Sequence, residues 1–327
     1  MLMNASEFLT VLGHELSDLA SDDRQQILEY YQELILDSKE QGYSEKEIIE
    51  GFGEPEDVAK RVRAEYGGMV VYAGSARDEE AKDYRASDLV HTIKVEATNV
   101  TIRVRTVEAG PIRVLFKPRE NRDRVVFSEE NGIFRFRHEM RSLFHLNWLN
   151  LLWDFNILIL EVPKNFAGTM ILKTSNAGIR AANLQNLTRG EFVAMNGKIA
   201  LKSVHADEMF LKTANAFLDM ENLKGRRLEA ITNNGNVSAK ECDFQEGILL
   251  QTKNGFVTGR NLISDNISMQ TCNGSVTGTI IGNINDYTID SQTVNGSNNL
   301  DCAANLSGPK KLTARTTNGR IKVEFIQ

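Results

Sequence analysis

The sequence lacks several features that would place it in a familiar class. It has 327 residues but only three cysteines, Cys242, Cys272 and Cys302, and no CxxC pair. Such a sparse, odd set favours a reducing compartment or a bacterial surface without disulfides. The sequence has no GxGxxG motif and no phosphate-binding loop, and its five histidines show no metal-ligand spacing. We therefore expect no cofactor and no metal site.

Export and membrane signals are also missing from the sequence. The first 20 residues contain Glu7, His14, Glu15 and Asp18, so they lack the basic start and apolar core of a signal peptide. No uncharged apolar stretch reaches the roughly 18 residues that span a bilayer. We expect no transmembrane segment and a location in the cytoplasm or at the membrane periphery. The alternative is the cell surface, reached by a non-classical route.

Charge is distributed unevenly along the chain. The formal net charge is −6, yet residues 1–66 contain 16 Asp and Glu against 6 Lys and Arg, a local net charge of −10. An acidic surface of this kind repels nucleic acid. It is either an ordinary solvated surface or a docking surface for a basic protein partner. Three of its residues are candidates for that contact: Glu45, Glu54 and Asp57.

The first 67 residues predict a small domain of four helices. Phe8, Leu12 and Leu16 recur at helical spacing in the first helix, and Ser21 is a candidate cap for a second helix ending near Gly42. Ser44 and Glu47 form a capping box for the third helix. Pro55 stands at a position that favours the first turn of a fourth helix.

This region resembles a known family. The segments "YYQELILD" and "GYSEKEIIEGFGEPEDVAKRV" are similar to the helical signalling domain that accompanies PadR-type regulators in bacterial operons (HAAS-like). The resemblance implies a module that is neither catalytic nor DNA-binding. It also implies a protein partner, either a regulator or an envelope protein.

Residues 68–88 read as a linker, and the hydrophobic period changes to two from Leu89 onward. Residues 89–160 predict a β-rich lead-in that caps the following repeats, with a hairpin at Asn131-Gly132. The segment "LFHLNWLNLLWDFN" holds both tryptophans, Trp148 and Trp153. It is either a buried cover of the sheet or an exposed contact with a membrane or a partner.

A recurring phrase dominates the rest of the chain: a short apolar strand, then Asn-Gly or Asn-Ala, then another apolar residue. The successive spacings are 20, 19, 19, 20, 19, 22 and 23 residues. The phrase centres on eight asparagines: Asn176, Asn196, Asn215, Asn234, Asn254, Asn273, Asn295 and Asn318. A fixed period with β-type alternation indicates stacked coils. Residues 161–327 therefore predict a right-handed parallel β-solenoid of about eight coils, and the chain a multidomain α plus all-β protein.

The recurring asparagines predict a structural ladder. One amide per coil at the same position can stack and form hydrogen bonds along the solenoid. In "LLQTKNGFVTGRNL" we expect Leu250, Thr252 and Asn254 to alternate inward. We place Asn318 on the exposed edge of the final coil. Thr174, Thr213, Thr232, Thr252 and Thr271 precede the asparagines by two residues and predict a second polar column.

Residues 89–327 resemble an adhesin-like solenoid family of unknown function that is common in bacteria (DUF4097-like). The resemblance lies in the "TxNG" phrases, the "ILILEVPK" strand and the "ENGIFRF" hairpin. It implies a solenoid with a role at the cell surface.

Catalysis would need carboxylates that cluster on adjacent coils. The best set is Asp219, Glu221, Glu241 and Asp243, but their offsets from the coil asparagines differ, so they do not stack. We therefore predict no enzyme activity and no catalytic residue. The preferred function is a non-enzymatic accessory of bacterial envelope-stress or signalling systems. The first alternative is a surface adhesin that binds a glycan or a protein, and the second is a carbohydrate-active β-helix enzyme.

Overall fold

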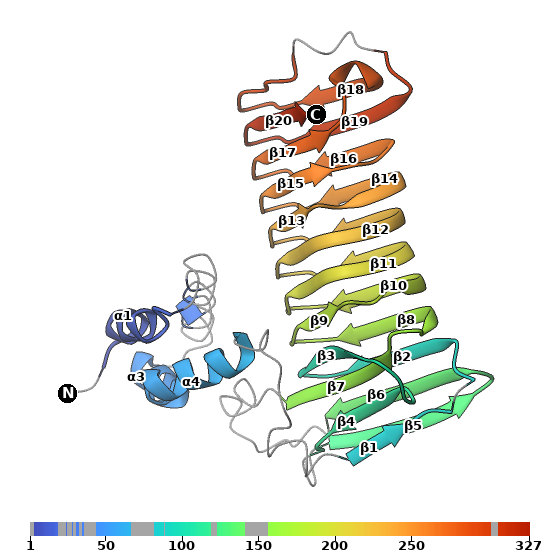
Figure 1. Cartoon of the computed structure of the whole chain (residues 1–327). Helices are drawn as coiled ribbons and strands as arrows, with labels where there is room; N and C mark the ends of the chain where they lie inside the picture. The colour runs from blue at the N-terminus through green and yellow to red at the C-terminus, as the bar shows by residue number, and fades with distance from the viewer. Residues whose placement is uncertain are drawn as a thin grey trace. The chain divides into compact units, whose positions relative to one another are not determined.

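The computed structural model describes residues 3–18, 24, 28, 31–32, 35, 44–66, 82–87, 89–118, 123–140, 156–301 and 307–327. The chain divides into two compact units, one built on the N-terminal helices and one built on strands (Figure 1). Together they give a small helical domain and a large, mostly β domain with a solenoid-like sheet. This agrees with the predicted combination of a small helical domain and a large β domain.

The helical unit contains three complete helices in its described part, where the sequence predicts four. They are α1 (Ala5–Glu15), α3 (Glu45–Phe52) and α4 (Pro55–Tyr66). Most of the predicted second helix lies outside the described residues, although Tyr31 and Ile35 within it are helical and buried.

Local sequence signals set the helix ends. The capping box of Ser44 and Glu47 is present at the start of α3, and α4 begins at Pro55, as predicted. A second capping box, formed by Asn4 and Glu7, starts α1. Phe8 of α1 and Phe52 of α3 pack with their ring centroids 5.0 Å apart. The apolar stripes therefore meet in one small core, as their helical spacing requires.

The β unit contains twenty strands in its described part. They are β1 (Lys82–Arg85), β2 (Thr92–Ala97), β3 (Val100–Val107), β4 (Arg113–Phe116), β5 (Asp123–Glu130), β6 (Ile133–Met140), β7 (Asn156–Pro163), β8 (Ala167–Thr174), β9 (Ile179–Ala182), β10 (Asn186–Ala194), β11 (Ile199–Lys212), β12 (Leu218–Ile231), β13 (Val237–Lys240), β14 (Asp243–Gln251), β15 (Val257–Leu262), β16 (Asn266–Gln270), β17 (Val276–Ile281), β18 (Tyr287–Gln292), β19 (Lys310–Arg315) and β20 (Ile321–Ile326). A short 3₁₀ helix, η1 (Ile284–Asp286), precedes β18. Figure 1 shows the strands stacked one above another along the unit.

The strands form two columns joined at the asparagine corners. Parallel pairing in the first column follows the order β6-β2-β8-β10-β11-β12-β14-β16-β19-β18. In the second column the order is β7-β3-β9-β11-β12-β13-β15-β17-β20. Inward side chains alternate with outward ones in both columns, so one apolar core fills the space between them.

Strand order departs from chain order at both ends of the stack. At one end, β2 and β3 lie inside the later strands β6 and β7. At the other end, β19 lies between β16 and the earlier strand β18 (Figure 1). At the first end, β6 and β7 therefore lie outside β2 and β3. At the other end, β18 lies outside β19 in the first column, whereas β20 is the outermost described strand of the second column.

The first end of the stack carries the predicted hairpin. β5 and β6 pair antiparallel, and Asn131 and Gly132 both have positive φ, at 51° and 69°. These values fit the tight turn that Asn-Gly favours in hairpins. β4 also pairs antiparallel with β7, and β1 pairs antiparallel with β4. The lead-in therefore closes the stack with antiparallel strands.

Candidate functional site

The recurring asparagines form one continuous chain of hydrogen bonds along the corner between the two columns. From Asn176 onward, each Nδ2 donates to the Oδ1 of the asparagine before it in the stack at 2.7–2.8 Å. The spatial order is Asn99, Asn176, Asn196, Asn215, Asn234, Asn254, Asn273, Asn318 and Asn295. We call this set the asparagine ladder. Asn99 was missed because Val100 follows it and because 77 residues separate it from Asn176.

Two details of the sequence prediction are wrong. Asn254 does not point inward, because it is exposed at the corner. Asn318 does not lie at the edge, because it donates to Asn273 and accepts from Asn295. The terminal rung is Asn295. The threonines two residues before the asparagines are the buried members of the corner: Thr252 Oγ1, for example, donates to the carbonyl of Gly235 at 2.8 Å.

The ladder makes a testable prediction about stability. Asn254→Ala removes two side-chain hydrogen bonds and should lower the free energy of unfolding by about 1–2 kcal/mol. Asn318→Ala should cost about as much, and Asn295→Ala about half, because Asn295 makes only one ladder bond. Urea unfolding at constant m measures the differences. Equal, negligible effects at all three positions would show that the asparagines only favour the turn.

A second corner lies seven residues after five of the ladder asparagines, Asn176 to Asn254, and requires a left-handed backbone. Its residues are Asn183, Ser203, Asn222, Glu241 and Asn261, with φ between 52° and 59°. Asparagine tolerates this conformation better than other side chains, which bring Cβ close to the following carbonyl. Glu241 is therefore a poor fit at its position.

Replacing Glu241 by asparagine should stabilise the protein. We expect Glu241→Asn to raise the free energy of unfolding by about 0.5–1 kcal/mol, because it relieves the strain of a left-handed glutamate. The matched control is Asn222→Glu at the equivalent corner, which should lower stability by a similar amount. Chemical denaturation of both variants measures the two shifts. A lower free energy of unfolding for Glu241→Asn would contradict the claim that the backbone at Glu241 is strained.

Two of the acidic residues weighed as a catalytic set, Asp219 and Glu221, form ion pairs between coils. Glu221 contacts Lys202 at 2.9 Å and Lys240 at 3.1 Å, and both contacts hold the pKa of Glu221 below its usual range. Asp219 lies 3.0 Å from Lys198. A general acid needs the opposite shift, a raised pKa. These carboxylates therefore act as links between neighbouring strands.

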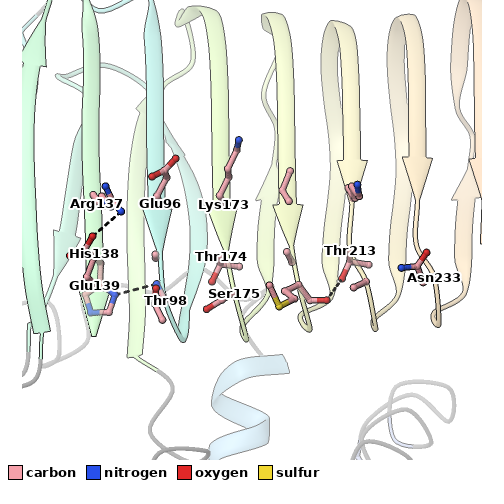
Figure 2. Close-up of a pocket in the computed structure, with 16 residues that line it drawn as sticks. Glu96, Thr98, Arg137, His138, Glu139, Lys173, Thr174, Ser175, Thr213 and Asn233 are labelled. Carbon is pink, nitrogen blue, oxygen red and sulfur yellow. Dashed lines mark hydrogen bonds and ion pairs between the residues drawn. The ribbon is translucent and has the colours of Figure 1, made fainter. Parts of the chain in front are cut away.

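A groove of about 460 Å³ runs along the ends of the first-column strands, next to the asparagine ladder. Figure 2 shows its lining side chains on successive strands, with Arg137, Glu96 and Lys173 on one side and Thr98 and Ser175 at the strand ends. We call it the corner groove. Ala97, Ala194 and Ala214 leave room there because their side chains are small, and Met195 is 57% exposed at its rim. Sequence reasoning missed the groove because its residues come from separate coils.

A buried histidine lies in the lining of the corner groove. His138 is 1% exposed, and its Nε2 lies 3.1 Å from Asp123 Oδ1. Its Nδ1 accepts a hydrogen bond from the backbone nitrogen of Thr98 at 3.4 Å. The hydrogen bond from Thr98 ties β6 to the first corner.

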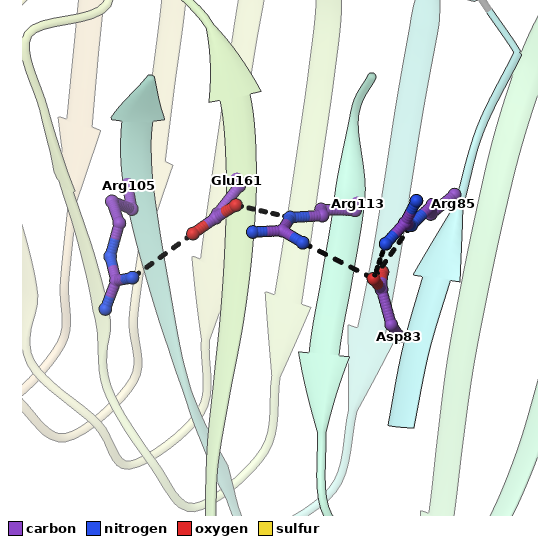
Figure 3. A network of polar contacts seen from close by, with 5 residues as sticks. All are labelled: Asp83, Arg85, Arg105, Arg113 and Glu161. Atoms are coloured by element: carbon purple, nitrogen blue, oxygen red, sulfur yellow. Dashed lines mark hydrogen bonds and ion pairs between the residues drawn. The ribbon is translucent and has the colours of Figure 1, made fainter. Parts of the chain in front are cut away.

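A network of arginines and carboxylates joins four neighbouring strands at the first end of the stack (Figure 3). Glu161 of β7 lies between Arg105 of β3 at 3.1 Å and Arg113 of β4 at 2.5 Å. Arg113 also reaches Asp83 of β1 at 3.3 Å, and Arg85 pairs with the same carboxylate. Glu161 holds the pKa of Arg113 above its usual value. We call these five residues the arginine network.

The predicted interaction residues differ in their surroundings. Glu54 and Asp57 are exposed around the start of α4, and Asp57 lies 3.5 Å from Lys60. Glu45 is half-buried and accepts a hydrogen bond from the backbone nitrogen of Ala5 at 2.7 Å, so it holds α1 against α3. Trp148 and Trp153 lie outside the described residues.

Two of the three cysteines, Cys242 and Cys272, lie in the described residues. Burial raises the pKa of the Cys242 thiol to about 12, so this cysteine is inert as a nucleophile. Cys272 is exposed, and Cys302 lies outside the described residues. In the parts of the chain that the structure describes, no three His, Cys, Asp or Glu side chains gather in a way that could hold a metal ion. No helix in those parts is long and apolar enough to cross a membrane.

These features define a class: a solenoid-like β protein that carries a small acidic helical domain. Comparison with known families identifies the family within this class. The Toastrack DUF4097 family model matches residues 90–324, and the HAAS model matches residues 7–61. The chain belongs to the Toastrack DUF4097 family and carries an N-terminal HAAS domain, which confirms both resemblances.

Other comparisons add little. No curated protein matches the chain. One solved structure is similar, described as "a putative cell adhesion protein from Clostridium sporogenes ATCC 15579". It shares 9% sequence identity, covers 75% of this chain and 99% of its own, and has a TM-score of 0.27. At that TM-score the likeness supports no argument about function.

Proposed function

We propose that the protein is a non-enzymatic accessory of bacterial envelope-stress or signalling systems, in which a solenoid scaffold carries a helical module that docks a protein partner. The observation that carries the proposal is the combination of domains: an acidic HAAS domain on the same chain as a Toastrack domain. HAAS domains are associated with partner regulators. The net charge of −10 in residues 1–66 favours a partner with a basic surface.

The proposed division of labour follows the predicted boundaries. Residues 1–67 dock the partner, 68–88 link, 89–160 cap the scaffold, and 161–327 form a right-handed solenoid of about eight coils. The asparagine ladder and the buried threonines stabilise the scaffold rather than bind a ligand. The Trp148 and Trp153 segment stays a candidate contact. We place the protein in the cytoplasm or at the membrane periphery.

The partner should carry a basic surface, because the exposed side chains of the module around α4 include Glu54, Glu56 and Asp57. Exposed charges of this kind speed association and set specificity more than they add affinity. Their effect falls as salt shortens the screening length, from about 10 Å at 0.1 M to about 3 Å at 1 M. A regulator of the PadR type is the first candidate by family association.

Co-purification from native cells tests the proposal. Tagged full-length protein should retain its regulator partner at low salt and lose it at high salt. Glu54→Lys with Asp57→Lys should abolish retention while helicity is unchanged; Glu45 is left intact because it holds α1. Glu130→Lys with Glu324→Lys, on the β unit, is a control with the same change in net charge. If both double variants retain the partner equally, the acidic surface is not the docking surface.

The corner groove favours a second candidate, an adhesin that binds an extended glycan or peptide. Its lining mixes small apolar residues with Arg137, Lys173, Lys212 and hydroxyl groups, and ligand sites combine such surfaces. Met195→Glu with Lys212→Glu should then abolish binding to intact cells. Unchanged cell binding by this variant would remove the adhesin candidate.

A further inference from the structure

The asparagine ladder consists largely of the dipeptide that is chemically least stable in proteins. Six of its members are followed by glycine: Asn196, Asn234, Asn254, Asn273, Asn295 and Asn318. In an Asn-Gly pair the unhindered glycine nitrogen can attack the asparagine side chain, and the amide is lost. Folded structure opposes this, because the side chain and backbone must leave their native positions before they can react.

The six pairs are not equally protected. The four inner rungs Asn196, Asn234, Asn254 and Asn273 each donate one ladder bond and accept another, and the glycines that follow them are buried. Asn318 also has both bonds, and Gly319 is half-buried. Asn295 makes one ladder bond, as donor to Asn318, and Gly296 is exposed. Asn295 is therefore the weakest point of the ladder.

The surroundings of Asn295 strengthen this contrast. Val294 beside it is 66% exposed, and β18 before it pairs with β19 alone among the described strands. In the described part of the chain, no further rung lies beyond Asn295. The corner can therefore open at Asn295 without separating two coils on either side.

We propose that Asn295 is a site of spontaneous deamidation and that the reaction then proceeds inward along the ladder in spatial order, Asn295 before Asn318 before Asn273. In the first step the Gly296 nitrogen bonds to Asn295 Cγ, the Cγ–Nδ2 bond breaks, and ammonia leaves with the former amide proton. Water then opens the cyclic imide at one of its two carbonyls. Attack at the side-chain carbonyl breaks its bond to the Gly296 nitrogen and gives aspartate. Attack at the main-chain carbonyl of residue 295 breaks the bond from that carbonyl to the same nitrogen and gives isoaspartate, and neither route needs an oxidant or a cofactor.

The inward order follows from the hydrogen bonds. An aspartate at position 295 has no Nδ2 to donate, so its carboxylate faces the Oδ1 of Asn318 without a proton between them. Asn318 then holds one ladder bond, as Asn295 did before it. An isoaspartate has the same effect and also lengthens the backbone at the corner. Each event thus moves the weakest point of the ladder one coil inward, toward Asn273.

Peptide mapping of the full-length protein tests the site. The folded protein is held in mildly alkaline buffer, and deamidation is followed at each Asn-Gly peptide by mass spectrometry and isoaspartyl methyltransferase labelling. We expect Asn295 to react about tenfold faster than Asn234 or Asn254, the factor that about 1.4 kcal/mol gives. In denaturant the ladder sites should react at similar rates. Equal rates at Asn295 and Asn254 in the folded protein would overturn the proposal.

Two variants test the order. Asn295→Asp and Asn295→Ala should both accelerate deamidation at Asn318 severalfold and leave Asn196, at the other end of the stack, unchanged. Asn131, an Asn-Gly in the β5–β6 turn outside the ladder, is the internal reference for buffer and handling. Circular dichroism confirms that both variants are folded. If the rate at Asn318 is the same in the wild type and in both variants, the reaction does not proceed along the ladder.

Discussion

Removal of residues 307–327 should destabilise β18 as well, although β18 lies outside the deleted residues. The deletion takes away β19, which lies between β16 and β18, and β20, which covers β17. β18 then has no strand partner among the described residues. The deletion also removes the buried side chains Leu312, Ile321 and Val323. At about 1.5–3 kcal/mol for each large apolar side chain, the loss is on the order of 5 kcal/mol.

Hydrogen exchange distinguishes this arrangement from a stack built in chain order. In the truncated protein the β18 amides should exchange rapidly, although β18 itself is intact. If the coils were stacked in chain order, β18 would rest on β16 and keep its protection. Protected β18 amides after truncation would therefore contradict the interleaved strand order.

An internal deletion is the matched control. Replacing residues 283–308 with a link as short as the one between β15 and β16 removes the outermost coil and leaves β19 paired with β16. This variant lacks more residues than the truncated protein, yet it should stay folded with small loss of stability. The two deletions thus show whether the loss of stability depends on a strand's position in the stack or on its position in the chain.

The repeated part of the fold was predictable from sequence for a physical reason. Each coil buries the same kind of side chains at the same positions, so the period of 19 or 20 residues and the alternation of burial both follow from local residues. Helix caps and the Asn131-Gly132 turn are likewise local. These features need no knowledge of which strands meet.

The order of strands at the ends was not predictable in the same way. An apolar strand that can stack on β16 can stack equally on β19, because every coil presents the same pattern. Only the irregular spacings of 22 and 23 residues before Asn295 and Asn318 hint at a longer path there. Asn99 was hidden for a related reason, since the lead-in strands β4 to β7 separate it from the next rung.

The arginine network was beyond sequence reasoning as well. Arg105 and Arg113 lie 56 and 48 residues from Glu161, and nothing in the spacing brings them together. The one local signal is the glutamate itself, a single acidic residue in the apolar strand "ILILEVPK". A buried carboxylate of that kind needs a charged partner, but the sequence does not name which one.

Loss of the Glu161 carboxylate should be the most damaging single substitution at the first end of the stack. The Glu161 side chain is 6% exposed, and Glu161→Ala removes the carboxylate that the guanidinium groups of Arg105 and Arg113 share. Neither arginine can relieve the cost by losing its proton, because the pKa of an arginine stays far above any pH at which the protein folds. Breaking a buried ion pair costs about 3–5 kcal/mol. Because Arg105 and Arg113 are each about one-third exposed, we expect about 2–3 kcal/mol here.

Replacing both members of the ion pair by leucine shows whether this loss of stability comes from unpaired charge or from lost packing. The double variant Glu161→Leu with Arg113→Leu removes the pair and fills the space with apolar side chains, which is often neutral for buried pairs. It should therefore be more stable than Glu161→Ala, although it changes more atoms. Arg85→Ala is the surface control. Arg85 pairs with Asp83, but its side chain is 64% exposed, so Arg85→Ala should lower the free energy of unfolding by less than about 1 kcal/mol. Urea unfolding gives the free energies, and hydrogen exchange at β1 and β4 locates the loss. If Glu161→Ala costs no more than Arg85→Ala, water already screens the network, and the strands at this end are held by their apolar core alone.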